Sequence, residues 1–315
     1  MSLYISPPFY GLASVDSKSL QFLAAARFCA TELKVVHCRK NSDSPTGVIP
    51  SFVDGSEQIT DFVEFVEHLR RQHSDIQLDS ELSDKDKVLL EGFDALIKVG
   101  LLPALEQLFW IDDFNFSSLA SRMIAKTTAW PYYFFYLNTK RAEARKIVER
   151  TGKKPEQLEL DAIKTLNLLS AKLGNSKYFN GTRPSSLDAL IFGYLAPLFK
   201  LPMANDRVQL QLKALPNLAV FLESISSIYC PVADEGLGAV KEYKNLVIEV
   251  EKAKKRVEKE KMEKRMRERE KEQQESSNST NIAVFIAFSL TATVLFGLHT
   301  GIIQIPKVIQ DDDDE

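Results

Sequence analysis

An uncharged, apolar run near the end of the chain restricts its fold and location more than any other feature. It extends over the 22 residues Ile282–Ile303 and is followed by an acidic ending. At about 1.5 Å per residue, a helix of that length is about 33 Å long and matches the roughly 30 Å hydrocarbon core of a bilayer. The run therefore predicts one transmembrane helix over residues 281–304 and an acidic tail over residues 305–315. A helix so close to the end is expected to be inserted after synthesis, as a tail anchor.

The charges on the two sides of this run predict its orientation. The preceding segment, Lys241–Glu275, is rich in Lys, Arg and Glu, whereas only one basic residue, Lys307, follows the run. Lys and Arg accumulate on the cytosolic side of membrane helices. The greater part of the chain is therefore expected in the cytosol. The endoplasmic reticulum, the mitochondrial outer membrane and the peroxisome, which all receive tail anchors, are alternatives at this point.

The charged segment itself predicts a helical stalk over residues 236–280, because Lys, Glu, Arg and Met are good helix formers. One face carries a short apolar stripe, formed by Tyr243, Val247, Val250 and Val257. Apolar positions then disappear, so the pattern predicts a solvated stalk, with a short coiled coil as the alternative. Ser276–Thr280 predicts a short flexible break in the helix.

Charge and cysteine content exclude several functional classes. The formal net charge of −3 gives no general attraction to nucleic acids. Cys29, Cys38 and Cys230 are widely spaced, which argues against a disulfide framework, a zinc site and a dithiol redox motif. Cys29 falls in a predicted helix and is expected to be a small buried residue. No metal-ligand spacing links the histidines His37, His68 and His73.

Residues 1–75 show the pattern of a small α/β domain in the order β-α-β, then β-β-α. A first helix is expected to begin at Asp16 or Ser17, which can cap it, and a second follows Asp61. Asp54-Gly55 is typical of a hairpin turn. The predicted strands are Leu3–Ser6, Lys34–His37, Gly47–Val53 and a short strand that ends at Ile59.

Residues 76–235 are predicted to be helical throughout. Ser83 with Asp86, and Ser185 with Asp188, have the spacing of capping boxes at helix starts. Pro155 can open a helix that ends near Gly174. An α/β unit with a proline in its third strand, followed by an all-helical half, resembles the glutathione transferase fold. In that fold a thioredoxin-like domain packs on a helical domain, and a cis proline, here in Ile49-Pro50, lies in a turn facing glutathione.

Four stretches resemble one branch of this superfamily, the metaxins, and together they cover most of residues 1–230. They are GLASVDSKSL (Gly11–Leu20), LLPALEQLFWID (Leu101–Asp112), SSLDALIFGYLAPL (Ser185–Leu198) and KLPMANDRVQLQLKALPNL (Lys200–Leu218). The anchor and acidic tail also resemble the ending of metaxin-1-type proteins. The charged segment before the anchor has no counterpart in this resemblance.

The resemblance implies a non-catalytic subunit of the sorting and assembly machinery of the mitochondrial outer membrane, which helps to insert β-barrel proteins. It implies a location on the cytosolic face, beside a second, unanchored metaxin and the barrel-forming core subunit. Links to cristae-organising proteins and to motor adaptors are also implied. No cofactor, metal or catalytic residue is implied.

A membrane-tethered glutathione transferase is the rival hypothesis. That enzyme needs a hydroxyl or thiol at the start of the first helix, for which Tyr10, Ser14 and Ser17 are the candidates. It also needs an acidic residue followed by serine before a later helix, to bind the γ-glutamyl carboxylate. Thr60-Asp61 reverses that order. A carboxylate at this place would repel the ligand, so the sequence favours a protein without catalysis.

Two further features leave alternatives open. Trp110 is expected in the core or between domains, and so is Trp130, which begins the aromatic run Trp130–Tyr136. The run is predicted to be buried between helices or to form a partner-binding patch. The stalk would also suit an adaptor between mitochondria and cytoskeletal transport.

Overall fold

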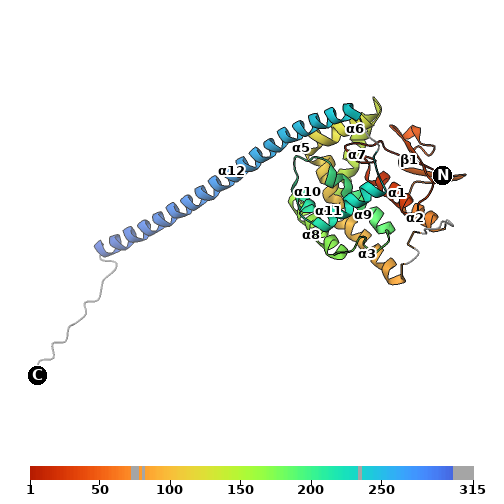
Figure 1. Cartoon of the computed structure of the whole chain (residues 1–315). Helices are drawn as coiled ribbons and strands as arrows, with labels where there is room; N and C mark the ends of the chain where they lie inside the picture. The colour runs from red at the N-terminus through yellow and green to blue at the C-terminus, as the bar shows by residue number, and fades with distance from the viewer. Residues whose placement is uncertain (72–77, 80–81, 233–235, 301–315) are drawn as a thin grey trace, which may run out of the picture. The chain divides into compact units, whose positions relative to one another are not determined.

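The computed structural model describes residues 1–71, 78–79, 82–232 and 236–300. The chain separates into two compact units, Met1–Val257 and Glu258–Glu315. The first unit contains the sheet, the helices before α12 (Gly236–His299) and the beginning of α12 (Figure 1). It joins a thioredoxin-like α/β part and an all-helical part of glutathione transferase type. The domain boundaries expected at 75/76 and 235/236 stay predictions.

A four-stranded sheet in the order β2-β1-β3-β4 forms one side of the first unit. β1 pairs in parallel with β2, where Leu3 lies opposite Val35, and antiparallel with β3, where Leu3 lies opposite Phe52. The predicted hairpin joins β3 to β4 through Gly55, whose φ of 58° suits a residue without a Cβ. The strands are β1 (Ser2–Ile5), β2 (Lys34–His37), β3 (Ser51–Asp54) and β4 (Glu57–Ile59).

Two helices pack on this sheet and complete the predicted β-α-β and β-β-α order. In α1 (Ser17–Phe28) most side chains are buried, because the helix lies between α2 (Phe62–Arg71) and α9 (Ser186–Lys200). Phe22 of α1 stacks on Phe65 of α2, with ring centroids 4.6 Å apart. Asp16, rather than Ser17, caps α1 by accepting the backbone N–H of Ser19 at 2.8 Å.

The rest of the first unit is helical, as predicted. The segment between α3 and α7 contains two π-helical turns, which the sequence did not predict. The elements are η1 (Asn41–Asp43), α3 (Asp84–Gly100), α4 (Leu102–Glu106), η2 (Gln107–Ile111), α5 (Asp113–Asn115), η3 (Phe116–Ala120), α6 (Ser121–Thr127), α7 (Tyr132–Glu149), α8 (Pro155–Leu173), α9 (Ser186–Lys200), α10 (Arg207–Lys213) and α11 (Pro216–Ile228).

Both predicted capping boxes are present, at the starts of α3 and α9. The buried box of α9 is reinforced from outside the helix. Asp79, in the segment before α3, accepts the backbone N–H of Ser186 at 2.8 Å and pairs with Arg70 of α2 at 2.6 Å. The beginning of α9 is thereby connected to the thioredoxin-like part.

The stretch Tyr243–Val257 of α12 (Gly236–His299) packs on the rest of the globular unit, where a solvated stalk was expected. Its buried side chains follow helical spacing: Leu246, Val250, Ala253 and Val257. Tyr243 adds a hydrogen bond, because its hydroxyl accepts the backbone N–H of Tyr10 at 2.8 Å. Lys254 pairs with Asp206 at 2.6 Å. The short apolar stripe in the sequence therefore marks an intramolecular contact.

We expect Val250→Ala to lower the free energy of unfolding of the first unit by roughly 1–3 kcal/mol, because it removes two buried methyl groups. Val250 is 2 % exposed, whereas the neighbouring Val247 is 37 % exposed. Val247→Ala in the same helix is the matched control and should change stability little. Urea unfolding monitored by circular dichroism measures both. Equal effects would show that α12 does not pack on the unit in solution.

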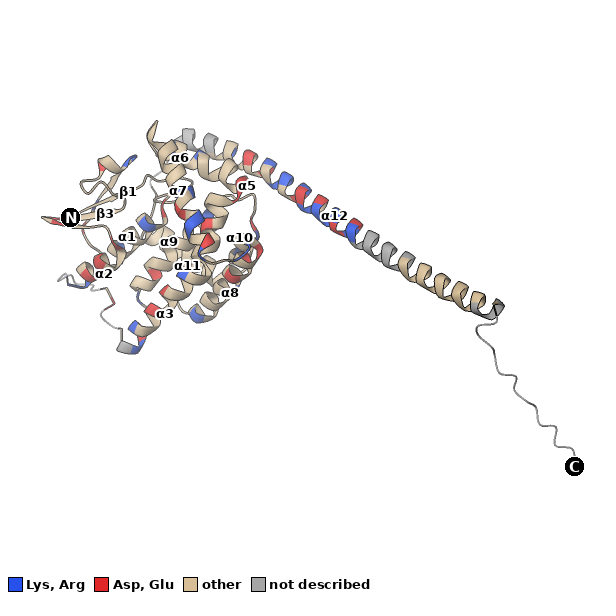
Figure 2. Cartoon of the chain, turned by 180° about the vertical axis from the view of Figure 1, so that it is seen from behind, with Lys and Arg blue, Asp and Glu red and all other residues tan. Residues whose placement is uncertain are grey.

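Beyond Val257, Lys, Arg and Glu alternate along α12 and then give way to uncharged residues (Figure 2). The break predicted at Ser276–Thr280 is wrong, since α12 continues to His299. Among the residues described, no helix is both long and apolar enough to cross a membrane. The last residues of the expected span, 301–304, and the acidic tail lie outside the described residues.

Candidate functional site

A cleft of about 320 Å³ opens between the loops of the sheet and the helices α6 and α7. One wall includes Asp16 at the start of α1 and Ile49, the residue before the buried proline; the opposite wall includes Tyr136 and Lys140 of α7. The peptide bond Ile49–Pro50 is cis, as predicted. The cleft therefore lies where the resemblance places the glutathione site.

The three hydroxyl side chains predicted for the start of α1 do not line this cleft. The Tyr10 ring packs edge-on against Tyr243, with centroids 4.9 Å apart, and burial raises its pKa. Ser14 is fully buried, and its Oγ accepts the backbone N–H of Asp16 at 3.3 Å. Ser17 is the first residue of α1 and does not line the cleft.

Asp61 caps the start of a helix. Its carboxylate accepts the backbone N–H groups of Val63 at 2.8 Å and Glu64 at 3.2 Å, so it caps α2. Because a carboxylate already accepts from these N–H groups, a ligand carboxylate would have to compete with it and would meet a like charge. Thr60 is exposed next to it. The order Thr60-Asp61, reversed from that of glutathione transferases, thus places a helix-capping carboxylate where the enzyme would bind the carboxylate of its ligand.

Cys38 is the one described thiol that lines the cleft, and no sequence motif marks it. Burial raises the pKa of Cys38, and the nearby carboxylate of Asp43 raises it further. Burial likewise raises the pKa of Cys29 to about 11 and of Cys230 to about 12. The three thiols are reduced and buried. A protonated thiol is a weak nucleophile, so none is suited to thiolate chemistry near neutral pH.

We expect iodoacetamide near neutral pH to alkylate all three cysteines at least about ten-fold more slowly in the native protein than in urea. The raised pKa values and the burial of the sulfur atoms both act in this direction. Mass spectrometry of timed, quenched samples gives the rate at each cysteine, with the unfolded protein as the control. Rapid native modification confined to Cys38 would instead indicate an activated thiol in the cleft.

The cleft holds charges of both signs that interact with one another. Lys140 Nζ lies 3.2 Å from Glu143 Oε2. Burial alone would lower the pKa of Lys140, but Asp16 and Glu143 outweigh it and raise that pKa. Burial raises the pKa of Glu106, next to the cleft, to about 7, although Lys140 acts in the opposite direction. A carboxyl with a pKa raised toward neutral pH thus lies beside the cleft, without an activated nucleophile next to it.

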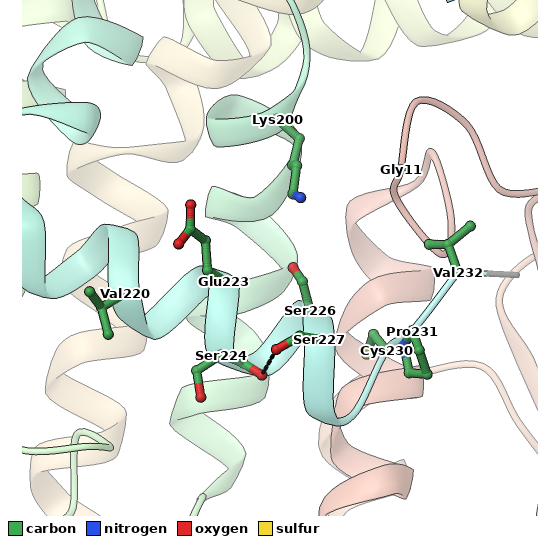
Figure 3. A pocket seen from close by; sticks show the side chains of 10 residues that line it. All are labelled: Gly11, Lys200, Val220, Glu223, Ser224, Ser226, Ser227, Cys230, Pro231 and Val232. Atoms are coloured by element: carbon green, nitrogen blue, oxygen red, sulfur yellow. Dashed lines mark hydrogen bonds between the residues drawn. The ribbon is translucent and has the colours of Figure 1, made fainter. Parts of the chain in front are cut away.

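A second, more open hollow of about 720 Å³ lies along the end of α11 (Figure 3). Its wall includes Lys200, Glu223 and several serines, and Ser227 Oγ donates to the carbonyl of Ser224 at 3.1 Å. No set of three or more His, Cys, Asp or Glu side chains in the described part of the chain could hold a metal ion.

Comparison with known proteins gives the family. Residues 19–141 match the family model Tom37, described as "Outer mitochondrial membrane transport complex protein", and residues 162–225 match the glutathione S-transferase C-terminal domain. The chain is 35 % identical to the Metaxin-1 homolog of Caenorhabditis briggsae, and the match covers 97 % of each chain. The chain belongs to the metaxin family. It is thereby related to the proteins of the outer mitochondrial membrane transport complex.

Other metaxins are similar over about three quarters of the chain. Metaxin-3 of Xenopus laevis is 33 % identical over 73 % of this chain and 77 % of its own length. Metaxin-1 of Homo sapiens is 33 % identical over 73 % of this chain and 51 % of its own length. Among solved structures, glutathione S-transferase III in apo form has a TM-score of 0.46 and 16 % identity, over 75 % of this chain and 99 % of its own.

The aromatic run of this metaxin is divided between the interior and the surface. Trp110 is half-buried against the core, as expected. Trp130 is 79 % exposed, so its expected burial is wrong. Tyr136 is half-buried, and burial raises its pKa strongly, whereas Phe134 and Phe135 are exposed. Part of the run therefore lies at the surface, and its role as a partner-binding patch stays a prediction.

Proposed function

We propose that this metaxin is a non-catalytic subunit of the sorting and assembly machinery of the mitochondrial outer membrane, where it aids the import and insertion of β-barrel proteins. The similarity to a metaxin-1 homolog over 97 % of both chains carries the proposal. The match of residues 19–141 to a transport-complex family supports it. The partners would be a second, unanchored metaxin and the barrel-forming core subunit.

The site supports a role without catalysis. The cleft lacks a hydroxyl at the start of α1, its thiol is buried with a raised pKa, and the N-terminus of α2 is occupied by its own carboxylate. Each of these features leaves one requirement for binding or activating glutathione unmet. A glutathione transferase activity is the alternative, and retention of the protein on glutathione resin would favour it.

The apolar run supports attachment to the membrane with the globular unit facing the cytosol. Its described side chains are exposed, among them Phe285 (73 %) and Phe288 (76 %). The uncharged sequence continues to Ile303, beyond the last described residue. Alkaline carbonate extraction of mitochondria tests the attachment. The full chain should stay in the membrane pellet, and a chain truncated before Ile282 should be released.

The decisive experiment combines purification of partners with an import assay. The tagged full chain and the chain truncated before Ile282 are recovered from detergent-solubilised mitochondria and compared by mass spectrometry. Mitochondria lacking the protein are then supplied with a labelled β-barrel precursor. Recovery of a second metaxin and a barrel-assembly subunit, with slower barrel assembly after depletion, is the expected result. Normal assembly without recovery of either partner would contradict the proposal.

A role in mitochondrial positioning has one observation in its favour, which is the exposure of the charged residues Glu258–Lys271 in the second unit. A deletion that begins at Lys241 would also remove the packed Val250 and so disturb the globular unit. Deleting Glu258–Glu275 instead keeps that contact and removes five helical turns. An unchanged distribution of mitochondria after this deletion would exclude an adaptor role for the segment.

A further inference from the structure

The corner between α6 and α7 exposes an unusual amount of aromatic surface. We call Trp130, Pro131, Phe134 and Phe135 the aromatic corner. Trp130 is 79 %, Phe134 52 % and Phe135 68 % exposed, and Pro131 is exposed as well. Trp and Phe are usually largely buried, and clusters of exposed apolar side chains are typical of interaction sites. The proposed non-catalytic role uses none of these residues.

Basic residues gather around the aromatic corner, and three of them are ion-paired: Arg122 with Glu249, Lys140 with Glu143 and Arg141 with Asp113. Residues 114–142 contain four Lys or Arg residues and no Asp or Glu. Arg39 joins them from a distant part of the sequence. Its guanidinium donates to the carbonyl of Lys126 at 2.9 Å, and its own carbonyl accepts the N–H of Ala129 at 3.0 Å. Two exposed basic residues, Arg39 and Lys126, therefore flank the segment that carries Trp130.

The exposed side of α7 continues this arrangement along the helix. Phe134 and Phe135 lie in its first turn, and Arg145 and Lys146 lie exposed three turns later. Glu143, between them, is paired with Lys140. One helix thus presents aromatic side chains at its beginning and cations farther along, in the manner of segments that lie at a membrane interface.

We propose that the aromatic corner docks on the surface of an anionic lipid bilayer, with its rings among the headgroups and its flanking cations near the lipid phosphates. Charge complementarity favours lipid, because an anionic surface attracts nearby Lys and Arg residues. The inference rests on the proposed membrane attachment, which would keep the corner at a high local concentration near the bilayer. A protein partner is the other possible occupant, and the experiment distinguishes it.

The chain has only two tryptophans, which makes the corner directly observable. Trp110→Phe leaves Trp130 as the single reporter. Trp130→Phe leaves Trp110, which is half-buried and whose carbonyl accepts a bond from Arg141 at 3.0 Å, as the matched control. Both full-length variants are reconstituted into vesicles of phosphatidylcholine and phosphatidylinositol, with or without brominated acyl chains. Vesicle flotation measures whether the protein is attached to the membrane, independently of whether the aromatic corner contacts lipid.

Brominated lipid should reduce the emission of Trp130 at least about two-fold and leave that of Trp110 nearly unchanged. Lys126→Glu, or vesicles of phosphatidylcholine alone, should reduce this quenching. If Trp110→Phe does not fold, the wild-type spectrum minus that of Trp130→Phe gives the same signal. Protein that floats with its vesicles but shows no quenching of Trp130 would overturn the inference. The inference would also be overturned if Trp130 were shielded from acrylamide only in the complex extracted with detergent. The corner would then bind a protein partner.

Discussion

Replacement of Asp188 by alanine is expected to lower the free energy of unfolding by about 3–5 kcal/mol, because it leaves several buried donors without a partner. Asp188 is fully buried at the start of α9. Its carboxylate accepts the backbone N–H of Phe179 at 2.9 Å, the backbone N–H of Ser185 at 2.8 Å and the hydroxyl of Ser185. Thermal and urea unfolding measure the loss.

The capping box of α3 provides a matched control for Asp188. Asp86 accepts the backbone N–H of Ser83 at 3.1 Å and its hydroxyl at 2.6 Å, so the local chemistry is the same. Asp86 lies at the surface, where water can replace these bonds. Asp86→Ala should therefore cost several-fold less stability than Asp188→Ala. Equal losses would show that burial of the α9 box contributes nothing.

The two carboxyls should also give opposite pH dependences. Burial raises the pKa of Asp188 to about 6, despite its hydrogen bonds from Ser185 and Phe179. The native state then binds more protons than the unfolded state between about pH 4 and about pH 6, so this contribution to stability falls as pH rises. The hydrogen bonds from Ser83 lower the pKa of Asp86, whose contribution is instead lost at acidic pH.

Variants separate these two contributions to the pH dependence. Asp188→Ala should cost most near pH 4 and less near neutral pH, because the wild-type protein itself loses stability over that interval. Asp188→Asn, which cannot titrate, should remove the fall in stability between about pH 4 and about pH 6. A wild-type stability that rises over this interval, and keeps rising in Asp188→Asn, would show that other groups dominate.

Local patterns in the sequence were sufficient for most elements of the fold. The KVVH strand at Lys34–His37, the Asp54-Gly55 hairpin and the two capping boxes depend on neighbouring residues, and the structure places them as predicted. The buried stripe of α12 depends on a distant surface. Leu246 and Val250 become buried only because the globular unit supplies a partner face, and no spacing rule contains that information.

The candidate site was less accessible to prediction for the same reason. The sequence correctly predicted the cis bond before Pro50, but Cys38, Glu106 and Lys140 come from three separate segments and form no motif. The exposure of Trp130 contradicts its apolar character, and patterns of hydrophobicity assign such residues to the interior. Tertiary structure, together with interactions outside the isolated chain, decides these positions.

The contact between α1 and α9 leads to the second large expected effect. A Cβ added to Gly193 of α9 would lie 2.6 Å from the backbone carbonyl oxygen of Ser17 and would also overlap the Gln21 side chain. Real side chains do not approach a backbone atom so closely, so the two helices would have to separate. Gly193→Ala is therefore expected to cost about 3 kcal/mol. The change in the urea midpoint at constant slope measures this loss.

Gly92 of α3 provides the matched control, because nothing lies within 4 Å of a Cβ added there. Gly92→Ala should stabilise the protein by about 0.5–1 kcal/mol through helix propensity alone. Adding Gln21→Ala to Gly193→Ala should not restore wild-type stability, since the contact with the Ser17 carbonyl involves the backbone and remains. Full restoration would mean that the side chain of Gln21, and not the close approach of the two helices, requires glycine at this position.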